Sequence, residues 1–146
     1  MKMNKEQKLK EFNDIHRQVS GLYHEIAVKL KLSNSAFSIF YTIYEMGGSC
    51  FQKDICDLFY MSKQTIHSCM KKLEQEGYLL KKENDKHIYL TPKGEEFVKQ
   101  NIAPILELEK NIFEKMTEQE GDVLLELNKK YLHYFKQNLK EIGEFL

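Results

Sequence analysis

The 146-residue sequence has few of the features that mark secreted or membrane proteins. Its three cysteines form no Cys-x-x-Cys pair. An odd number of cysteines in a chain that shows no export signal argues against a disulfide framework. No apolar run approaches the roughly 18 residues needed to cross a bilayer. We therefore expect a soluble protein located in the cytoplasm.

Motifs of enzymes and metal sites are also scarce. The sequence has no glycine-rich phosphate loop, no nucleophile elbow, no paired carboxylate motif and no His-Glu-x-x-His, so we expect neither an enzyme nor a cofactor. His16, His24 and His133 have no cysteine or carboxylate at the spacing of a clear metal cluster, and we expect no metal. We interpret Cys56 and Cys69 as small residues of the core.

Arginine and net charge are the other scarce features. The formal net charge is zero, which argues against a protein that coats nucleic acid by bulk charge, and Arg17 is the only arginine. The charge is nevertheless uneven: residues 60–93 contain 7 Lys+Arg and 4 Asp+Glu, whereas residues 94–146 contain 7 and 11. This distribution is typical of a chain in which one region meets an anion and another meets water or a second subunit.

Helical periodicity accounts for most of the chain. Apolar or aromatic positions alternate by three and four residues from Leu9 to Leu30, which predicts a long first helix with one buried seam. A second helix is predicted from a cap at Ser33, Asn34 or Ser35 to Gly47-Gly48, followed by a strand stub at residues 49–51. Ile55, Cys56 and Phe59 give the inner face of a short third helix.

The fourth predicted helix begins at Ser62 and ends before Gly77. At 100° per residue its two sides differ in chemistry. The inner side consists of Ile66, Cys69, Met70 and Leu73. The outer side consists of Gln64, His67, Ser68, Lys71 and Gln75.

A two-stranded hairpin is predicted next, with residues 78–82 and 87–91 on either side of a polar turn. Ile88 and Leu90 should face inward, and His87 and Tyr89 outward. Thr91 and Pro92 are typical of a helix start. This fifth helix contains Pro104, where we expect a kink or a break. Residues 117–120 match a capping box, which predicts a last helix with apolar and aromatic residues at helical spacing.

Two helices joined by a turn, the second followed by a hairpin, form a helix-turn-helix with a β wing. The second of these helices carries groups that match the edges of bases: Gln64 for adenine, His67 for guanine, and the hydroxyls of Thr65 and Ser68. Lys63, Lys71 and Lys72 match phosphates.

The alternative is a helix whose polar residues are only caps and a solvated face. Lys81, Lys82, Lys86 and His87 in the hairpin favour the DNA-binding interpretation, because they extend the cationic surface of the helix.

The chain resembles the MarR family of winged-helix transcriptional regulators. The segments that carry the resemblance are KDICDLFYMSKQTIHSCMKKLEQEGYLLK, residues 53–81, and LTPKGEEF, residues 90–97. The family's order of six helices, with the wing after the fourth, fits residues 8–142. The resemblance implies a mainly α fold with a small β wing, that is, a winged helix-turn-helix core with N- and C-terminal dimerisation helices. It implies one domain over residues 1–146, in which residues 33–91 form the DNA-binding lobe and residues 5–31 and 92–143 form the dimerisation helices.

Family members are homodimers that straddle a palindrome, and the resemblance assigns two sets of DNA-binding residues. The recognition-helix set is Ser62, Lys63, Gln64, Thr65, His67, Ser68, Lys71 and Lys72. The wing set is Lys82, Lys86 and His87. Many relatives carry Asp-x-Arg in a longer wing, whereas this chain has Asp85-Lys86-His87. A narrow minor groove attracts arginine better than lysine, so we expect weak wing readout or phosphate contacts alone.

Two further expectations concern partners. The seam of the first helix and the aromatic side of the last helix expose more apolar surface than the winged core can cover, which favours a homodimer over an intramolecular helix pair. Family members often hold aromatic or phenolic effectors between the dimer helices and the DNA-binding lobe. The residues at the corresponding place are Tyr23, Phe40, Tyr41 and Tyr44, for which the alternative is plain core.

The predicted function is therefore a sequence-specific, double-stranded-DNA-binding transcription regulator, with repression as the expected outcome and release by a small aromatic effector as an option. The alternative from another class is a winged-helix protein-interaction module whose basic face docks an acidic partner.

Overall fold

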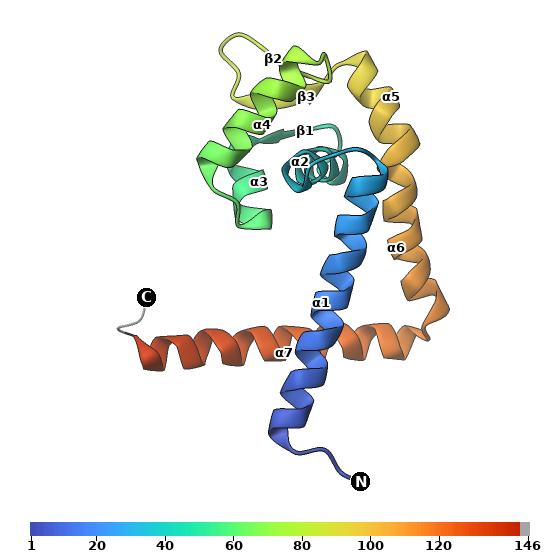
Figure 1. The fold of residues 1–146 in the computed structure, drawn as a ribbon, viewed down its shortest axis with the longest axis vertical. Helices are drawn as coiled ribbons and strands as arrows, with labels where there is room; N and C mark the ends of the chain where they lie inside the picture. Colours follow the sequence, from blue (N-terminus) through green and yellow to red (C-terminus); the bar gives the residue numbers. More distant parts are fainter. Residues whose placement is uncertain (144–146) are drawn as a thin grey trace. The chain divides into compact units, whose positions relative to one another are not determined.

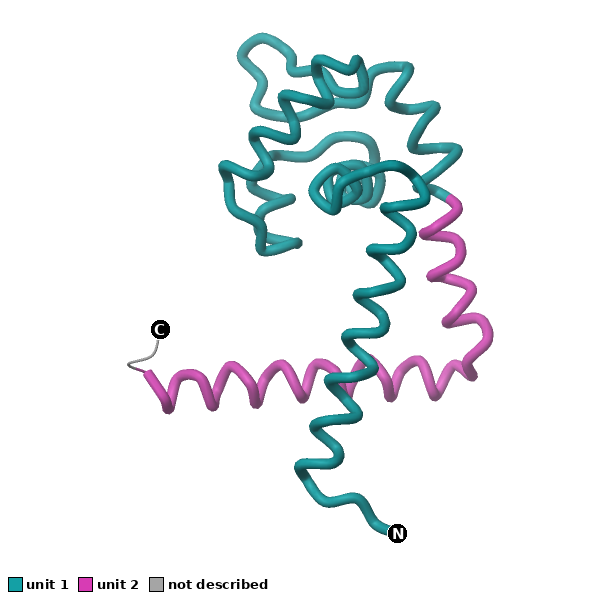
Figure 2. The backbone as a smooth tube through the Cα atoms, viewed as in Figure 1, with its two compact units in different colours: residues 1–103 teal, residues 104–146 magenta. Residues whose placement is uncertain are grey.

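Seven helices and three short strands occur in the computed structural model, which describes residues 1–143 (Figure 1). In chain order they are α1 (Lys5–Lys29), α2 (Asn34–Glu45), β1 (Ser49–Phe51), α3 (Gln52–Phe59), α4 (Lys63–Gln75), β2 (Leu79–Lys81), β3 (His87–Leu90), α5 (Pro92–Asn101), α6 (Ala103–Lys115) and α7 (Glu118–Ile142). The predicted mainly α fold with a small β wing is confirmed. The backbone divides into two compact units at residues 103 and 104 (Figure 2). None of the helices in residues 1–143 has the length and apolar character that a bilayer span requires.

Local capping determines where the helices of the first unit begin and end. The Ser33 hydroxyl accepts from the amide of Ala36, and the Ser62 hydroxyl accepts from the amide of Thr65, each at 3.1 Å. α2 ends before Gly47 and Gly48, and α4 ends before Gly77, all three with positive φ (89°, 117° and 84°). The predicted starts and stops of both helices are therefore confirmed.

Pro104 produces a break instead of a kink, since α5 ends at Asn101 and α6 begins at Ala103. The predicted fifth helix is therefore two helices. The capping box of the last helix is present: the Thr117 hydroxyl accepts from the amide of Glu120 at 3.1 Å, and Glu120 Oε1 accepts from the amide of Thr117 at 3.4 Å.

The sheet has one strand more than the predicted hairpin. β1 pairs antiparallel with β3, and β3 pairs antiparallel with β2, in the order β1-β3-β2. Cys50 lies opposite Ile88, and both side chains are buried. The strand stub thus joins the wing to the rest of the lobe, a pairing between segments far apart in the sequence that local patterns do not reveal.

α2 is the centre of the winged lobe, with α3, α4, α5 and the sheet around it (Figure 1). Its Ile39, Phe40 and Ile43 are fully buried. α4 contributes Ile66, Met70 and Leu73, each at most 3% exposed, as its helical period predicts. The outer side of α4 is left to solvent because the inner side is held in this core.

Gly94 in the first turn of α5 permits a close approach to the end of α4. A Cβ at this position would collide with the carbonyl oxygen of Tyr78 and lie 3.1 Å from its carbonyl carbon. The Gly94→Ala variant should therefore be destabilised by about 1–3 kcal/mol through overpacking. Urea denaturation at fixed protein concentration measures this, with Gly21→Ala as the control because nothing lies within 4 Å of the added carbon. Equal midpoints for the two variants would contradict the predicted clash.

Candidate nucleic-acid interface

The outer side of α4 presents every residue of the predicted recognition-helix set to solvent. These exposed residues are Ser62, Lys63, Gln64, Thr65, His67, Ser68, Lys71 and Lys72. The hydroxyls of Ser62 and Thr65 lie 2.7 Å apart, so they bond each other at the helix start. Gln64 and His67 lie on this exposed face about one turn apart. They are near the N-terminal end of the helix, which is the end of a recognition helix that commonly contacts bases.

Gln52 also belongs to this surface, although it is not among the predicted residues. Its side-chain amide donates to the carbonyl oxygen of Lys63 at 3.0 Å, which ties the start of α3 to the start of α4. Gln52 lines a shallow groove together with Lys63, Gln64 and His67. A polar residue at the start of the first helix of a helix-turn-helix was the available signal, but its partner is a backbone oxygen 11 residues away.

The three lysines of the wing have different surroundings. Lys81 Nζ lies 3.8 Å from Glu74 Oε1 on α4, and Lys82 Nζ lies 4.1 Å from the centroid of the Tyr89 ring. Lys86 is exposed and forms no ion pair among residues 1–143. The cationic surface of α4 therefore continues into the wing mainly through Lys86, and in part through Lys81 and Lys82.

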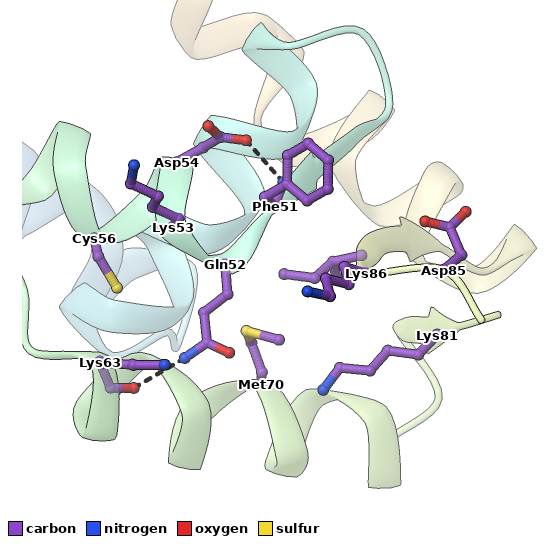
Figure 3. Close-up of a pocket in the computed structure, with 11 residues that line it drawn as sticks. Phe51, Gln52, Lys53, Asp54, Cys56, Lys63, Met70, Lys81, Asp85 and Lys86 are labelled. Atoms are coloured by element: carbon purple, nitrogen blue, oxygen red, sulfur yellow. Dashed lines mark hydrogen bonds between the residues drawn. The ribbon is translucent and has the colours of Figure 1, made fainter. Parts of the chain in front are cut away.

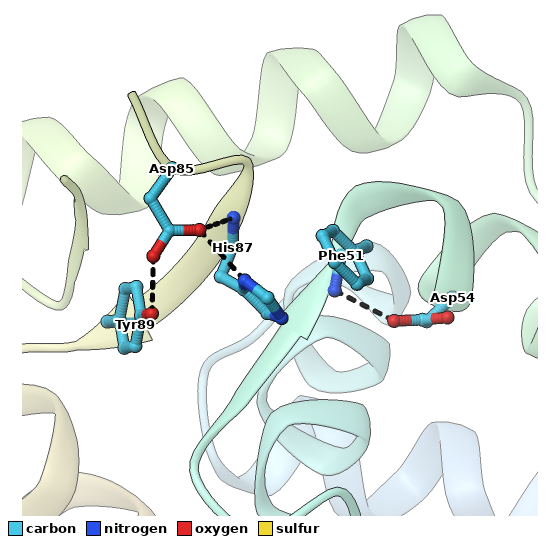
Figure 4. Close-up of polar contacts among 5 residues, drawn as sticks. All are labelled: Phe51, Asp54, Asp85, His87 and Tyr89. Carbon is cyan, nitrogen blue, oxygen red and sulfur yellow. Dashed lines mark hydrogen bonds and ion pairs between the residues drawn. The ribbon is translucent and has the colours of Figure 1, made fainter. Parts of the chain in front are cut away.

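His87 lies on the outward face of the wing, since the neighbouring Ile88 is buried, but it is only partly exposed because Phe51 covers part of it. Its ring centroid lies 3.9 Å from that of Phe51, with an angle of 33° between the ring planes (Figure 4). Its Nδ1 lies 2.8 Å from Asp85 Oδ1. The imidazole thus packs on β1 and bonds a carboxylate within the wing.

Asp85 accepts three hydrogen bonds from the wing (Figure 4). The Tyr89 hydroxyl donates to Oδ2 at 2.6 Å, and the backbone amide of His87 donates to Oδ1 at 2.9 Å. These bonds lower the pKa of Asp85 from 3.8 to about 2. The bond from Tyr89 has the largest effect, and the bonds from His87 come next. The same bond raises the pKa of Tyr89, so the phenol stays a donor at neutral pH.

A pocket of about 720 Å³ lies between α3, α4 and the wing (Figure 3). Lys53, Lys63, Lys81 and Lys86 surround it, and Met70 and Ile88 are part of its apolar lining. Figure 3 shows the side chain of Lys81 directed towards Met70 and that of Lys53 directed away from it. Asp54 and Asp85 also line the pocket, so the lysines leave an excess of positive charge between the recognition helix and the wing.

A second pocket, of about 400 Å³, lies between α1, α2 and α3 and contains part of the predicted effector set. Tyr23 and Tyr41 line it together with His24, Asn34 and Phe37. Phe40 does not, because it is fully buried and its ring packs on Tyr78 and Phe97. Tyr44, 37% exposed, also lies outside it. The structure therefore brings together two of the four predicted residues and adds Phe37 and His24.

Burial affects two of the three cysteines in the described part of the chain. Burial raises the pKa of Cys50 to about 12 and also raises that of Cys69, so both remain thiols at neutral pH. Within residues 1–143 no group of three or more His, Cys, Asp or Glu is arranged to hold a metal ion.

A helix-turn-helix with a polar outer face, followed by a lysine-bearing wing, defines a winged-helix DNA-binding protein. A family model described as MarR family matches residues 30–87. Over this segment the chain is similar to the MarR family, and the similarity supports a DNA-binding transcription regulator. No functionally curated protein matches it significantly.

Solved structures share the fold over nearly the whole chain. A MarR family regulator from Neisseria meningitidis has a TM-score of 0.78 and 18% identity, covering 97% of this chain and 100% of that one. The multiple antibiotic-resistance repressor (MarR) from Listeria monocytogenes has a TM-score of 0.54 and 25% identity, covering 90% and 95%. Bordetella bronchiseptica BpsR, whose DNA binding is regulated by 6-hydroxynicotinic acid, has a TM-score of 0.61 and 16% identity, covering 90% and 98%.

The hydrogen bond from Tyr89 can be tested through the ionisation of Asp85. A pKa below the ordinary value means that this bond stabilises the wing above about pH 4 and that the stabilisation is lost as the pH falls towards 2. The Tyr89→Phe variant should raise the pKa of Asp85 towards 3.8, because its largest cause is removed while the bonds from His87 remain. Carboxyl carbon NMR over about pH 2–6 measures this. Tyr44→Phe should leave the pKa of Asp85 unchanged, and an unchanged value in both variants would contradict the bond.

Proposed function

We propose that the chain is a cytoplasmic repressor that binds a palindromic operator as a homodimer and is released by a small aromatic effector. The observation that carries the DNA-binding part is the exposure of the whole predicted set on α4 while Ile66, Met70 and Leu73 are buried beneath it. Gln64 and His67 are assigned to base edges, and Lys63, Lys71 and Lys72 to phosphates. Lys82 and Lys86 supply phosphate contacts from the wing, and His87 supports them.

A homodimer is proposed because the last helix exposes large apolar side chains. None of the 25 residues of α7 is buried, although the helix carries large apolar side chains. Leu127, Leu132 and Phe135 are 56%, 54% and 50% exposed. α1 shows the same property at Ile15 and Leu22, 59% and 58% exposed. Exposed apolar surfaces of this kind mark contacts with a partner, which we propose is a second copy of the chain. Helices in proteins are stabilised mainly by such packing.

We assign residues 33–91 to the DNA-binding lobe and residues 5–31 and 92–143 to dimerisation. Two lobes related by a two-fold axis should place their recognition helices about 34–36 Å apart or a multiple of that distance, one turn of B-form DNA. The operator should accordingly be a palindrome.

An aromatic effector is proposed for the pocket lined by Tyr23 and Tyr41. Its volume of about 400 Å³ is within the range of small-molecule sites. Aromatic walls from Phe37 and Phe59 are combined with polar groups of His24 and Asn34, whose Nδ1 and Oδ1 lie 3.2 Å apart. An aromatic ring with a hydroxyl or carboxylate fits this combination, and the regulation of BpsR by 6-hydroxynicotinic acid supports the choice of ligand class.

Base readout by α4 can be tested with two glutamines of the same helix. The Gln64→Ala variant should lose about 1–3 kcal/mol of binding free energy on the selected operator and relax the preference at one base pair. Gln75→Ala, at the other end of α4, is the matched control and should keep affinity and preference. Selection of bound duplexes from a random pool, followed by titration, measures both. Binding without sequence preference and with a shallow salt dependence would instead support a module that docks an acidic protein.

The homodimer can be tested by light scattering at low micromolar concentration. The wild-type chain should have twice the mass of one chain, and the double variant Leu127→Lys/Phe135→Lys should be monomeric because it places charge on the apolar side of α7. Lys129→Gln, on the polar side of the same helix, should remain dimeric. A monomeric wild-type chain would contradict the two-fold operator.

A further inference from the structure

Asp85, like Glu83, places a negative charge in the hairpin whose lysines are proposed to meet DNA. By charge alone, a carboxylate at this position weakens binding to a polyanion. Its low pKa keeps it ionised at every pH at which DNA binding is measured. The contacts of this carboxylate suggest a compensating role.

Both carboxylate oxygens of Asp85 are used inside the wing. Oδ1 accepts from the backbone amide and lies 2.8 Å from Nδ1 of His87, and Oδ2 accepts from the hydroxyl of Tyr89. The ring of His87 packs on Phe51 of β1, whose own backbone amide donates to Asp54 at the start of α3, at 2.8 Å. The wing loop is thereby connected through β1 to the helix-turn-helix (Figure 4).

Lys86 lies between Asp85 and His87, which bond each other. Because Asp85 and His87 bond each other, the backbone on both sides of Lys86 is restrained, although its side chain is exposed. Lys86 lies on the rim of the pocket that Lys63 and Lys81 also surround (Figure 3). A restrained backbone lowers the conformational entropy lost when Lys86 meets a phosphate.

We propose that Asp85 is a positioning residue for DNA binding: by holding His87 on Phe51 it fixes the segment that carries Lys86, and this gain exceeds the repulsion of its own charge. The inference rests on the proposed function, in which Lys86 contacts a phosphate. It assigns a favourable role in DNA binding to an acidic residue of the wing.

Glu83 provides a matched control, because it is an exposed carboxylate two residues away in the same loop. Asp85→Asn and Glu83→Gln each remove one negative charge. Glu83→Gln should tighten or leave unchanged the binding of the selected operator. Asp85→Asn should weaken it by about twofold to fivefold, the range of one exposed charge contact. Fluorescence anisotropy with full-length protein at several salt concentrations measures both, and circular dichroism confirms that each variant is folded.

The Lys86→Ala background separates positioning of Lys86 from a general effect on the wing. Lys86→Ala alone should lower the salt slope by about 0.9. In that background Asp85→Asn should no longer weaken binding, and should tighten it as Glu83→Gln does, because only the loss of charge remains. This reversal of sign is the expected result.

Two results would overturn the inference alone. If Asp85→Asn tightens binding in the wild-type background, Asp85 acts only through its charge. If it weakens binding equally with and without Lys86, the residue supports the wing but does not position Lys86. Failure of the wild-type chain to bind any duplex would overturn the proposed function as well, so the two failures are distinguishable.

Discussion

Ile66, Met70 and Leu73 hold α4 against the core, and the presentation of its outer face depends on this packing. The three side chains are at most 3% exposed, and α2 supplies much of the surface that covers them. Since buried side chains of this size contribute about 1.5–3 kcal/mol each, the helix has a single defined rotation about its axis. That rotation directs Gln64 and His67 outward, where base edges can be read.

The wing depends on a different balance of forces. Its strands have only three or four residues, and a short hairpin alone is marginally stable in water. Pairing with β1 adds a third strand, and the Asp85 carboxylate adds three hydrogen bonds within the turn and the strand. The loop that is proposed to meet DNA is thus held by polar contacts, whereas α4 is held by apolar ones.

α7 is a third case. Local capping specifies where it starts, but its stability depends on packing against another surface. A complete capping box at Thr117 starts it, but no residue along its length is buried within the chain. Most helical stability comes from packing of an amphipathic face. A partner surface is therefore part of the physical account of this helix, and the proposed homodimer supplies it.

The sequence by itself determined the ends of α2 and α4, the start of α7 and the face of α4 that meets solvent, because caps, positive-φ glycines and a period of 3.6 residues act over a few neighbouring positions. Tertiary structure decided which distant residues meet. β1 pairs with β3, Gln52 reaches the carbonyl of Lys63, and His87 packs on Phe51 on the outward face of the sheet. It likewise placed Phe40 in the core and Phe37 in the aromatic pocket, although both belong to the same apolar pattern. These choices depend on contacts between segments that periodicity and capping do not connect.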